Sequence, residues 1–138
     1  MFGLADTLAQ LMVEAWPKWQ HPVDLVIPIP LHPNRYKTRG YNQSEKLVAL
    51  FCQQTNLQNG TPALKRIRHT RPQVGLDAAG RLENMQNAFQ ADSSLVAGRR
   101  VLLVDDVCTT GATLAAAAEA LLAAGATAVS AYCLARAM

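Results

Sequence analysis

Short apolar runs and helical patterns alternate along most of the chain. Residues 1–20 predict an amphipathic helix, because apolar residues recur there at helical spacing. These apolar residues are Leu4, Leu8, Leu11, Met12 and Ala15. Asp24–Pro30 is a β-branched run that ends in prolines, which predicts a buried strand that enters a loop. Asn42–Glu45 resembles a capping box and predicts the start of a helix, and Ala63–Ile67 predicts a further strand.

The C-terminal part of the chain contains the clearest unit, with the order strand, loop, helix, strand. Val101–Val104 is fully apolar and predicts a buried strand, and Asp105–Gly111 predicts the turn that follows it. Thr113–Ala124 predicts an alanine- and leucine-rich helix that ends before Gly125. Thr127–Leu134 predicts the closing strand. This alternation is typical of an α/β fold with an open, mainly parallel sheet, flanking helices and right-handed crossovers.

Composition limits the class of protein further. The 138 residues suit a single domain spanning 1–138, and 50% hydrophobic with 17% charged residues is an ordinary globular balance. No apolar stretch reaches the length of a membrane span, and the N-terminal segment lacks the basic start of a signal peptide, so we expect a cytoplasmic protein without membrane insertion. The three cysteines form no C-x-x-C motif, which argues against a zinc site or a disulfide framework. The net charge of +3 permits an anionic partner without requiring one.

The segment VLLVDDVCTTGAT, residues 101–113, carries the strongest chemical signal. It places Asp105 and Asp106 where a buried strand leaves the core, and parallel sheets bind ligands at that end of their strands. A helix start with a glycine and several hydroxyls is suited to a phosphate. The residues expected to bind it are Thr109, Thr110, Gly111, Ala112 and Thr113. The two aspartates could accept hydrogen bonds from ribose hydroxyls or hold a divalent ion, so the segment predicts a sugar-phosphate site.

This segment has two alternative interpretations. A Walker A loop is excluded, because no G-K-[ST] follows a glycine-rich stretch. The other alternative is that the threonines only cap the helix and that the aspartates belong to a solvated turn.

Three sequence blocks together resemble a known family. VLLVDDVCTTGAT resembles the motif with which type I phosphoribosyltransferases bind phosphoribosyl pyrophosphate (PRPP). IPIPLHPNRYKTRGYNQSEKLV and RIRHTRPQVGLDAAGRLENMQNAF narrow the resemblance to the ComF/GntX family, which is linked to bacterial competence and DNA uptake. Members of that family commonly carry an N-terminal four-cysteine zinc module, and we expect this chain to lack it.

The resemblance implies further site residues. The positions that match the pyrophosphate loop are Leu31, His32, Arg35 and Arg39. Guanidinium groups can bind pyrophosphate bidentately, whereas His32 could equally be a loop histidine bonded to backbone. Residues 65–86 match the flexible hood that closes over the active site, and the alternative is a solvated basic loop. Its expected ligand-binding residues are Arg68, Arg71, Gln73 and Arg81.

The implied function is the binding of PRPP with Mg²⁺, or of a related ribose 5-phosphate ligand. Asp105 and Asp106 would be the catalytic carboxylates and would hold the Mg²⁺ cofactor through ribose and pyrophosphate. Purine salvage enzymes have an aspartate base where this chain has Thr109, so an active enzyme would use an acceptor that needs no deprotonation, such as an amine. The alternatives are a non-catalytic PRPP sensor and a single-stranded-DNA-binding module in natural transformation. A homodimer also remains open.

Overall fold

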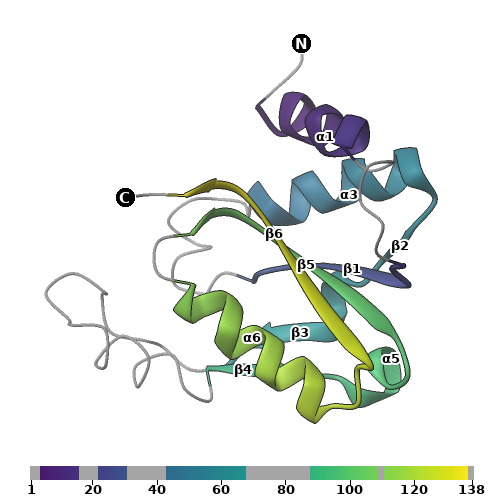
Figure 1. Ribbon diagram of the computed structural model, residues 1–138, viewed down its shortest axis with the longest axis vertical. Helices are drawn as coiled ribbons and strands as arrows, with labels where there is room; N and C mark the ends of the chain where they lie inside the picture. Colours follow the sequence, from purple (N-terminus) through teal and green to yellow (C-terminus); the bar gives the residue numbers. More distant parts are fainter. Residues whose placement is uncertain (1–3, 16–21, 31–42, 68–87, 109–110, 137–138) are drawn as a thin grey trace, which may run out of the picture.

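The computed structural model describes residues 4–15, 22–30, 43–67, 88–108 and 111–136 (Figure 1). The helices are α1 (Leu4–Ala15), α3 (Gln43–Thr55), α5 (Ser93–Val96) and α6 (Ala112–Ala123), with one 3₁₀ turn, η2 (Thr61–Ala63). The strands are β1 (Leu25–Pro28), β2 (Gln58–Asn59), β3 (Leu64–Arg66), β4 (Phe89–Ala91), β5 (Arg100–Cys108) and β6 (Ala128–Arg136). A four-stranded parallel sheet has the order β2-β1-β5-β6, and β3 and β4 form a separate antiparallel pair. The expected α/β fold with an open parallel sheet and flanking helices is confirmed.

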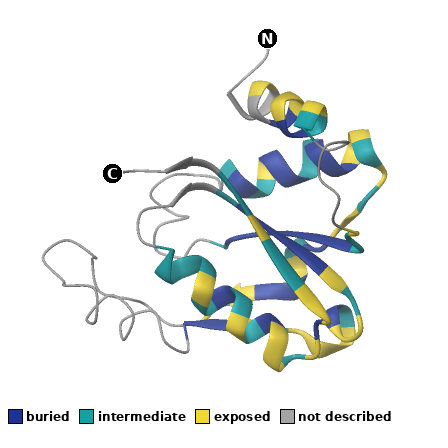
Figure 2. Cartoon of the chain, viewed as in Figure 1, coloured by how far each residue is buried: buried dark blue, intermediate teal, exposed yellow. Residues whose placement is uncertain are grey.

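Both faces of the parallel sheet are covered, which explains why β1 and residues 101–104 of β5 are apolar throughout. Successive side chains of a strand point to opposite faces, so Leu103 of β5 packs with Leu121 of α6, whereas Leu102 packs with Phe51 of α3. Met12 of α1 extends the cluster on the α3 face. The buried residues accordingly form one layer on each side of the sheet (Figure 2).

The end of β1 tolerates Pro28 because β2 is short. The Ile29 N–H donates to the Val104 carbonyl at 2.9 Å on one side of β1, and the Val26 carbonyl accepts from the Gly60 N–H at 2.8 Å on the other side. Alternate residues of a strand bond to the same neighbour, so the missing N–H of Pro28 would have pointed toward β2. Since β2 ends opposite Val26, no ladder hydrogen bond is lost at Pro28.

Several boundaries differ from those predicted. The strand expected over Val101–Val104 continues to Cys108, because β6 pairs with it as far as Cys108↔Arg136. Asp105 and Asp106 therefore belong to a strand, and the prediction of a turn beginning at Asp105 is wrong. Leu11 was expected on the apolar face of the first helix but is 51% exposed. The pattern also missed β2, β4 and α5, which are short.

The chain requires glycine at position 60 because there is no room for a side chain there. A Cβ built there would lie 2.6 Å from Cγ of Leu25, which is a buried core side chain. We expect Gly60→Ala to lower the free energy of unfolding by about 1–3 kcal/mol through overpacking, as measured by urea denaturation. An unchanged unfolding midpoint would mean that Leu25 can move aside without cost.

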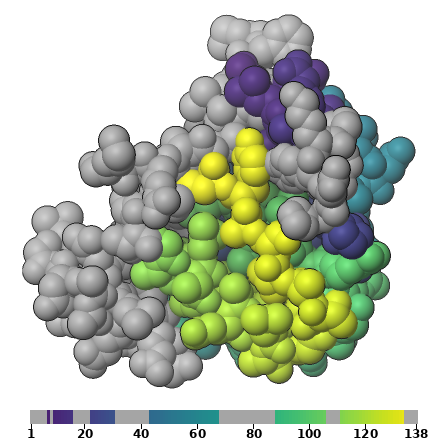
Figure 3. All heavy atoms as spheres, in the orientation of Figure 1, coloured from purple at the N-terminus to yellow at the C-terminus, as the bar shows by residue number. Residues whose placement is uncertain are grey.

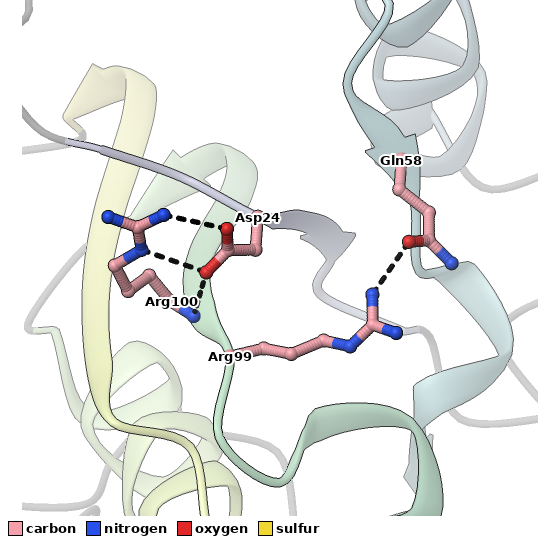
Figure 4. A network of polar contacts seen from close by, with 4 residues as sticks. All are labelled: Asp24, Gln58, Arg99 and Arg100. Carbon is pink, nitrogen blue, oxygen red and sulfur yellow. Dashed lines mark hydrogen bonds and ion pairs between the residues drawn. The ribbon is translucent and has the colours of Figure 1, made fainter.

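An ion pair joins the amino ends of β1 and β5 (Figure 4). The Asp24 carboxylate accepts two hydrogen bonds from the Arg100 guanidinium, both at 2.8 Å, and one from the Arg100 backbone N–H at 2.9 Å. Next to it, the Arg99 guanidinium donates to the side-chain carbonyl of Gln58 at 2.7 Å. Hydrogen bonds from the Arg100 side chain, followed by its backbone N–H, hold the pKa of Asp24 well below its ordinary value of 3.8.

This lowered pKa predicts a pH-dependent contribution to stability. A carboxyl whose pKa is depressed by folding stabilises the fold above its ordinary pKa, and the contribution is lost as the pH falls toward the folded-state pKa. The melting temperature of Asp24→Asn should therefore lie below that of the natural chain at neutral pH, and the difference should shrink below about pH 4. Glu119→Gln is the control, since Glu119 is exposed on α6. A difference that stays constant down to about pH 3 would contradict the assignment.

Candidate functional site

The site is defined by a topological switch point between β1 and β5. These strands are neighbours, yet the chain leaves β1 through α3 on one face and leaves β5 through α6 on the other. Where two such connections diverge, they leave a crevice at the carboxyl ends of the strands. The hydrogen bond from Ile29 to Val104 marks that edge of the sheet. Strand β1 ends at Pro28, opposite Val104, whereas β5 continues to Cys108, so the last residues of β5 run past the start of the loop that follows β1.

Asp105 lies at this edge. It follows Val104 directly, is half-buried, and is aligned with Cys133 of β6. By strand alternation it shares the α6 face of the sheet with Leu103. Its carboxylate can accept hydrogen bonds from hydroxyls or bind a divalent ion, as expected for a ribose contact. The backbone of Asp106 continues β5, and its side chain lies outside the described part of the structure.

Gly111 begins α6 at the same edge and on the same face. It has φ 80° and ψ −1°, the left-handed conformation that favours glycine, and its carbonyl accepts from the Ala115 N–H at 2.9 Å. A Cβ at Gly111 would meet nothing within 4 Å, so the requirement is conformational and not steric. Because glycine occupies the N-cap position, the cap residue itself contributes no side-chain hydrogen bond to this helix.

A second helix N-terminus lies at the same edge, on the opposite face. Helix α3 follows β1 and begins at Gln43, and its next residue, Ser44, is only 2% exposed. Nε2 of Gln43 is buried and has no hydrogen-bond partner in the part of the chain that the structure describes. The positive ends of α3 and α6 therefore flank the switch point from the two faces, an arrangement that favours a ligand with two anionic groups. By resemblance, Gln43 is the last of residues 39–43, which match the pyrophosphate loop, but the sequence predicts no individual contact for its side chain.

The base of the expected hood is an antiparallel strand pair. Arg66 at the end of β3 is aligned with Phe89 at the start of β4, and its guanidinium carbon lies 5.5 Å from the Phe89 ring centroid. The Ile67 N–H donates to the Ala88 carbonyl at 2.8 Å. The two ends of the intervening segment are thus held together. Lys65 and Arg66 belong to β3, which confirms the strand expected over Ala63–Ile67.

The other expected site residues cannot be placed. Those of the pyrophosphate loop, the hood and the first half of the phosphate loop lie outside the described residues. They are Leu31, His32, Arg35, Arg39, Arg68, Arg71, Gln73, Arg81, Thr109 and Thr110. Of the positions expected to bind phosphate, Gly111, Ala112 and Thr113 are described, and they form the cap and first turn of α6.

The chemistry of the described residues limits what the site could hold. Within the described ranges, no three histidine, cysteine, aspartate or glutamate side chains are grouped so that they could hold a metal ion. The two adjacent aspartates suit Mg²⁺ only if the ligand supplies most of the oxygens, as phosphates commonly do. Burial raises the pKa of the Cys52 thiol to about 11, so this cysteine is not a nucleophile near neutral pH. Among the described helices, none has the length and hydropathy needed to cross a bilayer.

Comparison with known proteins agrees with this geometry. Residues 53–138 match the phosphoribosyl transferase domain family. The chain is 40% identical over 113 residues to the DNA utilization protein YhgH of Escherichia coli K12, covering 82% of this chain and 49% of that protein. It is 39% identical over 120 residues to competence protein F of Haemophilus influenzae, covering 82% of this chain and 52% of that protein. The chain thus spans about half the length of these relatives.

A solved structure supports the fold. Glutamine phosphoribosylpyrophosphate amidotransferase from B. subtilis superposes with a TM-score of 0.64 at 20% identity, over 94% of this chain and 26% of that protein. At this level of identity the likeness concerns the fold alone. The family match covers more than half of the chain. The relatives include a competence protein F, in agreement with the ComF family that the three sequence blocks resemble. The chain therefore belongs to the phosphoribosyl transferase domain family, among its ComF-type members.

Proposed function

We propose that this domain binds PRPP together with Mg²⁺ at the switch point between β1 and β5. The observation that supports the proposal most is the position of Asp105, which lies in β5 just past the end of its pairing with β1, on the face where α6 begins at Gly111. A sugar phosphate needs a hydroxyl acceptor and a phosphate donor close together, and this edge offers both.

Each end of the ligand would have its own partner. The first turn of α6 would bind the 5′-phosphate through backbone N–H groups, and Asp105 and Asp106 would accept hydrogen bonds from the two ribose hydroxyls. The N-terminus of α3, with Gln43, would face the pyrophosphate together with arginines of the preceding loop. Bound Mg²⁺ would supply charge neutralisation on the phosphate oxygens.

If the domain is catalytic, the reaction supported best is pentosyl transfer to an amine. The bond from C1 of the ribose to pyrophosphate breaks as the amine lone pair forms a bond to C1, and the amine then loses a proton to solvent. The developing positive charge on the ribose would lie near the Asp105 carboxylate, which stabilises it electrostatically. Thr109 stands where salvage enzymes have their base, so an acceptor that must first be deprotonated is disfavoured.

A second candidate is a binding module without turnover. The relatives are named for DNA utilization and competence, which favours a role in DNA uptake, either as a PRPP sensor or on single-stranded DNA. Basic loops can follow a phosphate backbone, but stacking platforms are scarce because aromatic residues are only 6% of the chain.

Calorimetry with PRPP and Mg²⁺, followed by a pyrophosphate-release screen across amines, tests these candidates. Saturable binding and release with a defined amine support the transferase. Binding without release supports the sensor. Salt-dependent oligonucleotide binding without any PRPP binding would overturn the proposal, because the switch point would then serve another ligand.

A further inference from the structure

An asparagine followed by glycine lies at the end of β2. Asn59 and Gly60 form the Asn-Gly pair of this sequence, and the Asn59 side chain is exposed. In such a pair the backbone nitrogen of the glycine can attack the side-chain carbonyl carbon of the asparagine, because glycine has no Cβ to hinder the approach. Asparagine is for this reason among the thermolabile residues of proteins. The pair is therefore a candidate site of spontaneous covalent modification.

Two features of the folded chain oppose this attack. The Gly60 N–H donates to the Val26 carbonyl at 2.8 Å, so β1 holds both the nitrogen that would attack and the proton that it must lose. Asn59 is part of a strand, and an extended backbone keeps the Gly60 nitrogen turned away from Cγ of Asn59. The pairing of β2 with β1 thus protects Asn59 from reaction.

This pairing is short. Strand β2 has two residues, and among the described strands it pairs with β1 alone. A second contact comes from the Arg99 guanidinium, which donates to the side-chain carbonyl of Gln58 at 2.7 Å on the surface (Figure 4). The opposite edge strand, β6, has nine residues and lies beside α6 on the face shown in Figure 3. Because short exposed edges open at a lower free energy than the core, β2 should leave β1 without unfolding of the whole chain.

We propose that Asn59 is a deamidation site that the fold protects and that reacts each time β2 leaves β1. In the open state the Gly60 nitrogen loses its proton to solvent and attacks Cγ of Asn59. The bond between this nitrogen and Cγ forms, the bond from Cγ to Nδ2 breaks, and ammonia leaves. Water then opens the cyclic succinimide at either carbonyl, which gives aspartate or isoaspartate. The net reaction consumes water, releases ammonia and requires no cofactor.

The two products differ in their effect on β2. Oδ1 of Asn59 accepts from the Thr61 N–H at 3.0 Å and from the Thr61 hydroxyl at 2.5 Å, and an aspartate retains this acceptor. Isoaspartate instead adds a methylene group to the main chain just before Gly60, which has no spare room against Leu25. The Gly60 N–H then loses its register with the Val26 carbonyl. Isoaspartate should therefore detach β2, whereas Asn59→Asp should keep it paired.

Deamidation and hydrogen exchange at the same nitrogen test this proposal together. The full chain is incubated at mildly alkaline pH with and without denaturing urea, and trypsin then releases residues 47–65 for tandem mass spectrometry. This peptide also contains Asn56, an internal control because bulky Leu57 follows it. In urea, Asn59 should convert well ahead of Asn56. Folding should slow the conversion of Asn59 at least about tenfold, and by the same factor by which it slows hydrogen exchange of the Gly60 N–H.

A variant that loosens β2 makes the test specific. Gln58→Ala removes the contact with Arg99 and should speed both deamidation and Gly60 exchange in the folded chain at least about twofold. Gln54→Ala is the matched control, since it removes the same side chain from an exposed position of α3 and should change neither rate. Circular dichroism and melting temperatures establish that both variants are folded during the incubation.

Three results would each overturn the proposal. An Asn59 that does not convert in urea is not a deamidation site. Equal conversion rates in the folded and unfolded chain would show that the pairing with β1 gives no protection. A Gln58→Ala rate no higher than that of Gln54→Ala would show that the reaction does not pass through release of β2. PRPP is absent throughout, so these outcomes do not depend on the proposed function.

Discussion

Replacement of Asp105 and Asp106 together by asparagine is expected to weaken Mg·PRPP binding about 100-fold, with little change in melting temperature. Each carboxylate would lose a charge-assisted hydrogen bond to ribose, worth about 1.5 kcal/mol at least, and two such losses correspond to about 100-fold in affinity. The fold should persist, because Asp105 lies past the end of the pairing between β1 and β5 and outside both core clusters. Calorimetry and thermal unfolding should be measured on the same samples.

Glu119→Gln provides the matched control for this loss of negative charge. Glu119 is exposed on α6, away from its N-terminus, so its replacement should leave affinity unchanged. Unchanged affinity in the double variant would remove the aspartates from the site. Loss of the folded state would instead give them a structural role.

Gly111→Ala is expected to weaken ribose 5-phosphate binding about tenfold, whereas Gly98→Ala should leave it unchanged. Both glycines have a positive φ, 80° and 75°, and neither would bring a Cβ within 4 Å of another atom. Both substitutions should therefore cost about 1–2 kcal/mol of stability through the same backbone strain. Only Gly111 lies at the start of α6, so only its replacement should disturb a phosphate bound there.

The informative quantity is the difference in ribose 5-phosphate affinity between the two glycine variants. Equal stability losses with a selective loss of ligand affinity in Gly111→Ala support the phosphate site. Equal affinity for ribose 5-phosphate in the two variants would mean that the cap of α6 does not contact the phosphate.

The central strands could be predicted from sequence because their positions are buried on both faces. Leu102 and Leu103 point to opposite cores, and this requires an uninterrupted apolar run that has no other common explanation. The short elements could not be predicted in the same way. Strand β2 consists of Gln58–Asn59, whose polar side chains are exposed, and it exists only because its backbone pairs with β1. The extension of β5 past Asp105 likewise depends on its pairing with β6.

The sequence could predict the part of the candidate site that comes from one continuous segment of the chain. The segment from Asp105 to Gly111 contains both the carboxylate and the helix cap, and the structure places both at the switch point. The sequence could not predict that the N-terminus of α3 lies across the switch point from that of α6. That position depends on which face of the sheet each crossover helix covers. Gln43 illustrates this limit, since nothing in its local sequence indicates that its amide nitrogen is buried.

Backbone amide resonances followed during titration with PRPP and Mg²⁺ test the central claim most directly. The largest shifts are predicted for the amides of Gly111, Ala112 and Thr113, with further shifts at Asp105 and at Gln43. Amides at the amino edge of the sheet, such as those of Gly98 and Asn59, should not move, because that edge is opposite the proposed site. Saturable shifts confined to the amino edge, or none at all at millimolar PRPP, would contradict the account.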